Sequence, residues 1–257
     1  MTHIKLLITN YDLTNWNFLL TDPNIIIVDD LTKTDIVISL RWTKLSDKIF
    51  KAIVLLEEYI PLFRKNTFLD LLIDKSYIPQ PYMNCRWFKK PIAESCGRGI
   101  TIHKTKPDFN SDFVLSPEIL TNLTNGFKSD FRLWIGLTSN GDFHICMPII
   151  ERRSTIKFDF ENLNGALTNI ALGGIRIFHS NINFISDVEI IVLDIIKTLG
   201  IKQINTKNKS HRFMLTGWDF IIDKNNELKL LEINTCPGMD LCHQPIMNDF
   251  INWIYMY

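Results

Sequence analysis

The chain has 257 residues, 46% of them hydrophobic and 22% charged, and its 28 basic residues balance 28 acidic ones. It is long enough for a substantial core, as one large domain or two to three small ones. The balanced charge excludes a strongly basic overall surface, so we expect no nucleic-acid partner. No apolar run approaches the roughly 18 residues of a membrane span, and we see no signal segment. We therefore predict a cytoplasmic protein with no membrane partner.

The five cysteines are scattered along the chain, which argues against a disulfide framework. Cys236, Cys242 and His243 lie close together but lack the paired short spacings of a zinc site. We interpret them as free thiols and a loop histidine.

The first sixty residues alternate short apolar runs with polar punctuation. Runs at residues 4–8, 25–28 and 36–40 predict buried strands of a parallel sheet. Residues 45–59 have helical spacing. Together these elements predict a small N-terminal α/β domain over residues 1–62.

The next stretch, residues 63–116, is predicted to form a central lobe. It begins with an expected helix, and three expected strands follow. A small-residue loop at 93–99 separates the first two of these strands. The expected helix covers residues 65–76, and the strands cover 86–91, 100–103 and 112–115.

Residues 117–257 are predicted to form a second, C-terminal lobe. Asn140-Gly141 is a strong hairpin signal. One helix is expected to start with Ser186 as N-cap and to end at Gly200. The elements expected before the last hairpin are strands at 131–137 and 143–150 and a helix at 184–199. A last helix is expected at 245–255.

The most informative segment is a predicted hairpin formed by strands 213–223 and 227–234. Asn225-Asn226 is expected to form a two-residue type I′ turn, because both residues tolerate positive φ. In that register Lys224 pairs with Glu227.

The same register places Asp219 directly opposite Glu232, and Asn234 shares their face. Opposed carboxylates repel unless something positive lies between them. Two carboxylates and an amide oxygen form a hard ligand set that suits Mg²⁺ carrying phosphates. The alternative is an ordinary polar face on a hairpin. The neighbours expected in the core are Phe220, Ile222, Leu231 and Ile233.

Several polar motifs upstream suit phosphate chemistry. Lys90 precedes the small-residue loop, whose backbone N–H groups can approach phosphate, although solvent-facing lysines are common. Asp130 and Arg132 are expected on one side of a strand, where an arginine fork suits a transferring phosphoryl group; a surface ion pair is as good an explanation. Arg152-Arg153 would direct one guanidinium inward and the other to solvent.

Seven segments between about residues 60 and 245 resemble, in their order, the ATP-grasp superfamily. They are KKPIAESCGRGI, FVLSPEI, KSDFRLWIGL, ERR, ALTNIALGG, GWDFIID and LLEINTCPG. KSDFRLW and LTN look most like the tubulin tyrosine ligase-like branch, and the LTN loop is also similar to bacterial peptide ligases. EINTCPGM is similar to D-alanine–D-alanine ligases. Two departures from the pattern are Pro117 at the hinge and Ala166 where tubulin ligases carry histidine.

The resemblance implies an ATP-grasp fold, α/β and α+β, with the small N-terminal domain and two α+β lobes clamping ATP. The implied catalytic groups are cationic: Lys90, Arg132 and one of Arg152 and Arg153, here assigned to Arg153. The implied metal ligands are Asp219, Glu232 and Asn234, with Asn169 beside them. The other implied ATP contacts are Lys65, Ser95, Gly97, Arg98, Gly99, Ser116, Pro117, Glu118 and Ile119.

The resemblance also implies the reaction, an ATP- and Mg²⁺-dependent ligation of a carboxylate to an amine through an acyl phosphate. Two Mg²⁺ ions are expected, with Mn²⁺ able to substitute. The expected partner is an amino acid together with a peptide or protein substrate, and both a monomer and a homodimer stay open. The alternatives are a small-molecule kinase of the inositol phosphate kinase type and a non-catalytic ATP-binding module.

Overall fold

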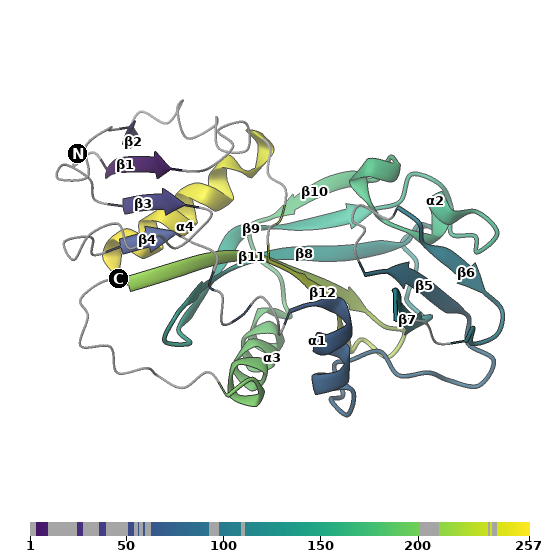
Figure 1. Ribbon diagram of the computed structural model, residues 1–257. Coiled ribbons are helices and arrows are strands. Elements are labelled where there is room, and N and C mark those ends of the chain that lie inside the picture. The colour runs from purple at the N-terminus through teal and green to yellow at the C-terminus, as the bar shows by residue number, and fades with distance from the viewer. Residues whose placement is uncertain are drawn as a thin grey trace.

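The structure is a computed structural model of the chain. It describes residues 4–9, 25–27, 36–39, 51–53, 56, 59, 63–92, 98–108, 111–200, 211–235, 237 and 241–257. Within these residues the chain forms two sheets and the helices that cover them (Figure 1). The predicted combination of α/β and α+β structure is confirmed.

The larger sheet has nine described strands, in the order β10-β9-β8-β11-β4-β3-β1-β2, with β12 paired to β11. The first three strands pair in parallel, as predicted, and a fourth parallel strand, β4, joins them to β11. The strands are β1 (Ile4–Thr9), β2 (Ile25–Ile27), β3 (Ile36–Ser39), β4 (Lys51–Ile53), β8 (Ser129–Thr138), β9 (Phe143–Arg153), β10 (Ile175–His179), β11 (His211–Ile222) and β12 (Leu228–Asn234).

The smaller sheet is antiparallel and has the order β6-β5-β7. Figure 1 shows it at the opposite end of the molecule from the N-terminal strands. Its strands are β5 (Trp87–Pro91), β6 (Thr101–His103) and β7 (Phe113–Pro117).

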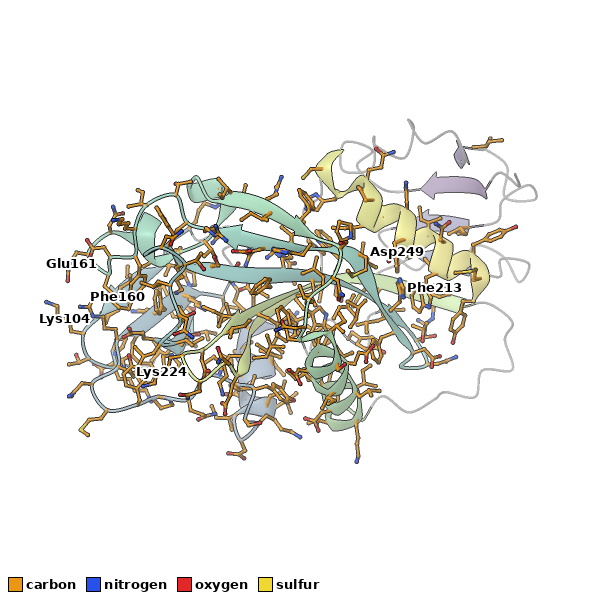
Figure 2. All side chains as sticks on the ribbon, turned by 180° about the vertical axis from the view of Figure 1, so that it is seen from behind. Lys104, Phe160, Glu161, Phe213, Lys224 and Asp249 are labelled. Atoms are coloured by element: carbon orange, nitrogen blue, oxygen red, sulfur yellow. The ribbon has the colours of Figure 1, made fainter. Side chains whose placement is uncertain are left out.

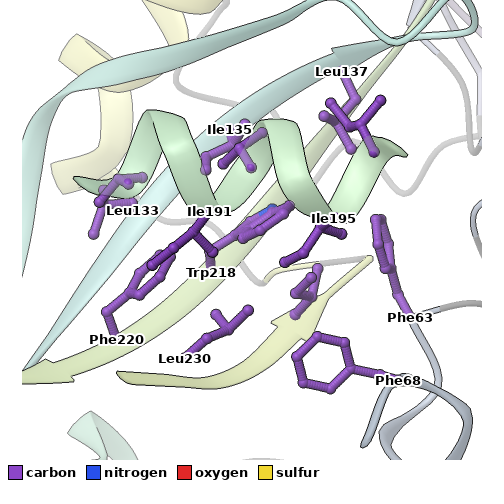
Figure 3. Packing of buried hydrophobic residues seen from close by; sticks show 14 of the residues in the cluster. Phe63, Phe68, Leu133, Ile135, Leu137, Ile191, Ile195, Trp218, Phe220 and Leu230 are labelled. Atoms are coloured by element: carbon purple, nitrogen blue, oxygen red, sulfur yellow. The ribbon is translucent and has the colours of Figure 1, made fainter. Parts of the chain in front are cut away.

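Helices cover both faces of the large sheet, and each face has its own core. On one face α3 (Ile185–Thr198) packs over the strands, with α1 (Lys65–Leu72) near β12 (Figure 3). On the other face α4 (Gln244–Met256) packs against β8, β9 and β11. Short helical segments are α2 (Leu163–Ala166), η4 (Ile170–Leu172) and η5 (Leu241–His243).

The α3 core is built from the inward faces of β8, β11 and β12. Trp218 and Phe220 are fully buried and stack with their ring centroids 6.3 Å apart. Figure 3 shows Ile191 and Ile195 of α3 beside them. This core holds β11 and β12 rigidly, so side chains on their opposite face have a stable base.

The close approach of α4 to β8 depends on a glycine. A Cβ atom at Gly136 would lie 2.6 Å from Phe250 and 2.7 Å from Trp253. Any larger residue there would push the helix away from the sheet, since real carbon atoms do not approach so closely.

Some sequence-based expectations are wrong. Residues 51–53, expected in a helix, form β4 between β3 and β11, because a buried central strand and a helix can share a short apolar run. Ser186 does not cap α3, whose N-cap residue is Phe184 without a side-chain cap. The Phe184 ring packs on Phe131 at 4.9 Å, so packing rather than capping sets this helix start.

Other elements agree with the expectations. Gly200 ends α3 with φ of 65° and α4 closes the chain near the expected bounds. β10 is a strand that the sequence patterns did not indicate.

Candidate active site

In the last hairpin Asp219 pairs with Glu232, as predicted, but the turn and the register next to it differ from the prediction. The turn is longer than expected: Asp223 N–H donates to Glu227 O, and Asn226 has φ of 64°. Lys224 therefore does not pair with Glu227.

A β-bulge restores the register nearer the site. Asp219 pairs with Glu232 but Phe220 pairs with Leu230, which leaves Leu231 as the extra residue. Leu230 is consequently fully buried, whereas Leu231 faces a pocket. The expectation that Leu231 lies in the core is wrong, because the bulge reverses the alternation of faces at that position.

Arg132 lies between the two opposed carboxylates. Its Nε donates to Asp219 Oδ1 and its Nη2 to Asp219 Oδ2, each at 2.7 Å. The same Nη2 lies 4.0 Å from Glu232 Oε1. The positive group between Asp219 and Glu232 is thus an arginine, and it holds the two acids together without repulsion.

Arg152 extends this arrangement to a second aspartate. It donates to Asp130 at 2.7 and 2.8 Å, and its Nη2 lies 3.0 Å from Asp219 Oδ2. The Thr168 hydroxyl also donates to Asp130. Asp130, Arg152, Asp219, Arg132 and Glu232 therefore form a row of alternating charges, which we call the charge row.

Burial in the charge row changes the acidity of Asp219. Burial alone would raise the pKa of this carboxyl, but the charges of Arg132 and Arg152, and their hydrogen bonds, lower it to about 2. The carboxylate in turn raises the pKa of both guanidinium groups against the effect of their burial. Asp219 and the two arginines are therefore charged at neutral pH.

Arg153, which was predicted as the catalytic arginine, lies on the other face of β9 from Arg152 and does not contact the charge row. Its Nη2 donates to Glu151 at 2.7 Å, and His179 contacts the same carboxylate at 2.9 Å. Successive residues of a strand point to opposite faces, so only one of two adjacent arginines can join the row.

A small pocket lies between β12, α1 and the small sheet, beside the charge row. Lys65, Lys90, Ser116, Leu231 and Glu232 are among the residues that line it. Burial lowers the pKa of Lys90, Glu232 opposes this effect and Lys65 adds to it. Two lysines beside one carboxylate give the pocket a positive balance that suits phosphate.

Lys128 occupies the junction between the two sheets. Its Nζ lies 5.4 Å from the ring centre of Phe88 on β5 and donates to Ala166 O at 3.0 Å. Burial, opposed by Asp130, lowers its pKa to about 8. Asp130 and Arg132 share one face of β8, and Lys128 precedes this strand at the same spacing of two residues. This spacing is a signal that could have added Lys128 and Asp130 to the predicted set.

The predicted hinge leaves β7 at the pocket. Ser116 lines the pocket and Pro117 ends the strand. The buried Glu118 carboxylate accepts from Arg86 N–H at 3.1 Å, so this side chain holds the hinge to the β5 side. Ile119 is half-buried.

The small-residue loop is only partly described. Ser95 and Gly97 lie outside the described residues, and Arg98 and Gly99 are exposed. Gly99 has φ of 69°, and a Cβ there would lie 2.8 Å from Pro91. Only glycine fits this turn.

Asn169 is joined to the charge row through its neighbour in sequence, Thr168. It is half-buried, precedes η4, and follows Thr168, whose hydroxyl contacts Asp130. The loop carrying Asn169 is thus fixed to the same row of charges.

The carboxylate and amide oxygens of Asp219, Glu232 and Asn234 are the ligand type that a hard divalent cation prefers, but Asp219 is largely occupied by arginines. Three arginine contacts occupy most of the roughly four acceptor positions of that carboxylate. The Glu232 side chain is 31% exposed, and its carboxylate lies 4.0 Å from Arg132 Nη2, beyond hydrogen-bonding distance. Glu232 is therefore the principal candidate oxygen ligand, with Asn234 two residues away on the same strand.

Comparison with known families adds an independent observation. Residues 178–255 match the tubulin-tyrosine ligase family. This match confirms the predicted resemblance to the tubulin tyrosine ligase branch of the ATP-grasp superfamily. It supports a ligase-type function with ATP-grasp-type ATP binding.

The matched segment covers about a third of the chain, from β10 into α4. It contains Asp219, Glu232 and Asn234, whereas Lys65, Lys90, Arg132 and Arg152 lie outside it. No curated protein matches the chain. Among the described residues, no helix is both long and apolar enough to cross a membrane.

Proposed function

We propose that the protein is an ATP- and Mg²⁺-dependent carboxylate–amine ligase that adds an amino acid to a peptide or protein. The supporting observation is that Lys65, Lys90 and Glu232 line one pocket beside the charge row. The pocket supplies cations for phosphate and an oxygen ligand for a metal, which are the groups that phosphoryl transfer requires. The family match favours ligation over other uses of these groups.

The proposed reaction has two steps. The substrate carboxylate attacks the terminal phosphate of ATP, giving ADP and an acyl phosphate, and an amine then displaces phosphate to form the amide. Catalysis of this kind depends on positioning and charge neutralisation rather than on a nucleophilic side chain.

The side chains take separate roles in this proposal. Lys65 and Lys90 bind phosphate oxygens in the pocket. Arg132 and Arg152 present guanidinium groups toward the transferring phosphoryl, and Asp219 keeps both in place through its hydrogen bonds. Glu232, Asn234 and the remaining acceptor position of Asp219 would hold Mg²⁺, which would supply further neutralisation of phosphate charge.

The adenine is proposed to bind at the hinge, against backbone groups of residues 116–119. The Glu118 carboxylate accepts from Arg86 N–H and the Glu118 N–H donates to Arg86 O, so the adenine would contact other backbone groups of this segment. We further propose the division into residues 1–62, 63–116 and 117–257, with the last two as the lobes around ATP.

A trapping experiment tests the reaction. Purified protein with Mg²⁺ and ATP is given pooled amino acids and peptides, and hydroxylamine replaces the amine in a parallel series. We expect ADP release that requires a carboxylate, and a hydroxamate product in the hydroxylamine series.

Other outcomes would redirect the proposal. ADP release with polyol phosphates, without hydroxamate, would identify a kinase. ATP binding without turnover, unchanged in Glu232→Gln, would identify a binding module.

A further inference from the structure

A second group of ligand-type side chains lies at the opposite end of β9 from Arg152. His144 and Cys146 are two residues apart on this strand and so project from one face. Asp249 joins them from α4, where the helix runs beside the large sheet (Figure 2). The ligand atoms of the three side chains all lie within 4.8 Å of one another.

This spacing is close to that of a bound metal. Zinc bonds of about 2.0–2.3 Å at tetrahedral angles place ligand atoms about 3.3–3.8 Å apart. His144 Nε2 and Asp249 Oδ2 are 2.9 Å apart, joined by a hydrogen bond. An ion can replace the shared proton if the three donors shift by on the order of 1 Å.

The donors are oriented by contacts outside the group. Trp253 stacks on the His144 ring with centroids 5.4 Å apart and planes 16° from parallel. Met147 N–H donates to Asp249 Oδ2 at 2.9 Å. Contacts of this kind hold metal ligands in a fixed orientation.

Access to the group is from one side. The side chains of His144 and Asp249 are 30% and 36% exposed, whereas Cys146 is fully buried. An ion arriving from solvent therefore meets imidazole and carboxylate first and the sulfur at the inner end.

We propose that His144, Cys146 and Asp249 form a binding site for a divalent transition metal of the zinc class, with water as fourth ligand. Sulfur and imidazole donors favour Zn²⁺ over Mg²⁺ or Ca²⁺, so the site is chemically distinct from the oxygen ligands near Glu232. The thiol proton is released to solvent as the thiolate binds the metal. The bound ion ties α4 to β9 and so fastens the closing helix to the sheet.

Cobalt titration tests the site directly. The untagged full chain, treated with chelator and free of ATP, is titrated with Co²⁺ while thiolate-to-cobalt charge-transfer absorption is followed. We expect saturation at a single ion per chain, displacement by Zn²⁺, and loss of the band in Cys146→Ser. His144→Gln and Asp249→Asn should weaken binding at least about tenfold.

Two other cysteines provide matched controls. Cys85 is buried two residues before β5 of the small sheet, and the Cys242 sulfur lies 3.9 Å from His243 Nδ1. Cys85→Ser and Cys242→Ser should keep the band. A band that survives in Cys146→Ser, or disappears in Cys242→Ser, places the metal elsewhere and overturns the proposal.

Thermal unfolding gives a readout that does not depend on the buried thiol variant. Zn²⁺ at roughly 100 times its dissociation constant should raise the melting temperature of the parent by about 5 °C or more. His144→Gln and Asp249→Asn, both at partly exposed positions, should lose most of this rise. A parent protein with neither a cobalt band nor zinc-dependent stabilisation would show that His144 and Asp249 form only an ion pair.

Discussion

The side chains of the charge row are expected to contribute unequally to the stability of the folded protein. Asp219 is buried and holds two arginines, whereas Glu232 is partly exposed and only 4.0 Å from Arg132. Removing a partner from a buried charge network is costly, because the remaining charges lose their compensation. A partly exposed pair at long distance contributes little.

We therefore expect Asp219→Asn to destabilise the protein by about 3 kcal/mol or more, and Glu232→Gln by less than about 1 kcal/mol. Urea unfolding without ATP measures both. Glu232→Gln should nevertheless abolish ADP release. Equal losses of stability in the two variants would contradict our description of the charge row.

Lys128 provides a test through pH. Its pKa is about 8 in the folded protein against 10.5 ordinarily, so between these values the unfolded chain binds more protons. Stability from this group should rise as pH increases from about 8 to about 10.5, with no change below that window.

The matched variant is Lys128→Met, which keeps the length of the side chain and cannot titrate. The unfolding midpoint is measured for both proteins across this pH range. The midpoint of the parent should rise with pH more steeply than the midpoint of the variant. An identical pH dependence in both proteins would show that Lys128 is not shielded from water between Phe88 and Ala166.

At the scale of elements, the hairpin depends on the bulge at Leu231. The bulge compensates for the longer turn, so Asp219 still meets Glu232 while the core residue changes from Leu231 to Leu230. Successive side chains of a strand point to opposite faces. A single inserted residue therefore changes which of the following side chains point into the core and which point to the pocket.

Alanine substitutions separate the two leucines. Leu230→Ala should cost about 2–5 kcal/mol because it opens a cavity beneath α3. Leu231→Ala should cost about 1 kcal/mol or less and weaken ATP binding at the pocket. Urea unfolding and nucleotide titration measure these effects, and the reverse order of stabilities would exclude the bulge.

For the whole molecule, the large sheet separates two polar groups that are adjacent in sequence. Arg152 joins Asp130 and Asp219 on the face of the proposed active site, and Arg153 joins Glu151 on the α3 face. The two neighbouring arginines thus have separate ion-pair partners on opposite faces of the sheet.

Arg152→Lys should lower the rate of ADP release by about 100-fold or more, because lysine cannot reproduce the two-nitrogen contact. Arg153→Lys should leave the rate within about threefold, since it changes only the other face. Circular dichroism confirms folding of each variant. A comparable loss of rate in Arg153→Lys would return that residue to the active site.

Local patterns were sufficient for much of the fold. Apolar runs predicted the parallel N-terminal strands, periodicity predicted α3 and α4, and residue order predicted the resemblance to ATP-grasp ligases. Periodicity did not distinguish β4 from a helix, because a strand paired on both sides reads as one apolar run.

Local sequence patterns are enough to identify the residue types that are available: lysines, two adjacent arginines, and an Asp, Glu and Asn set on a hairpin. The tertiary structure decided which of them meet. Pairing of β8 with β9 selected Arg152, pairing of β8 with β11 placed Arg132 between the acids, and docking of α4 brought Asp249 to Cys146. These contacts join residues far apart in the chain, and a shift of one residue in any strand would have reversed the outcome.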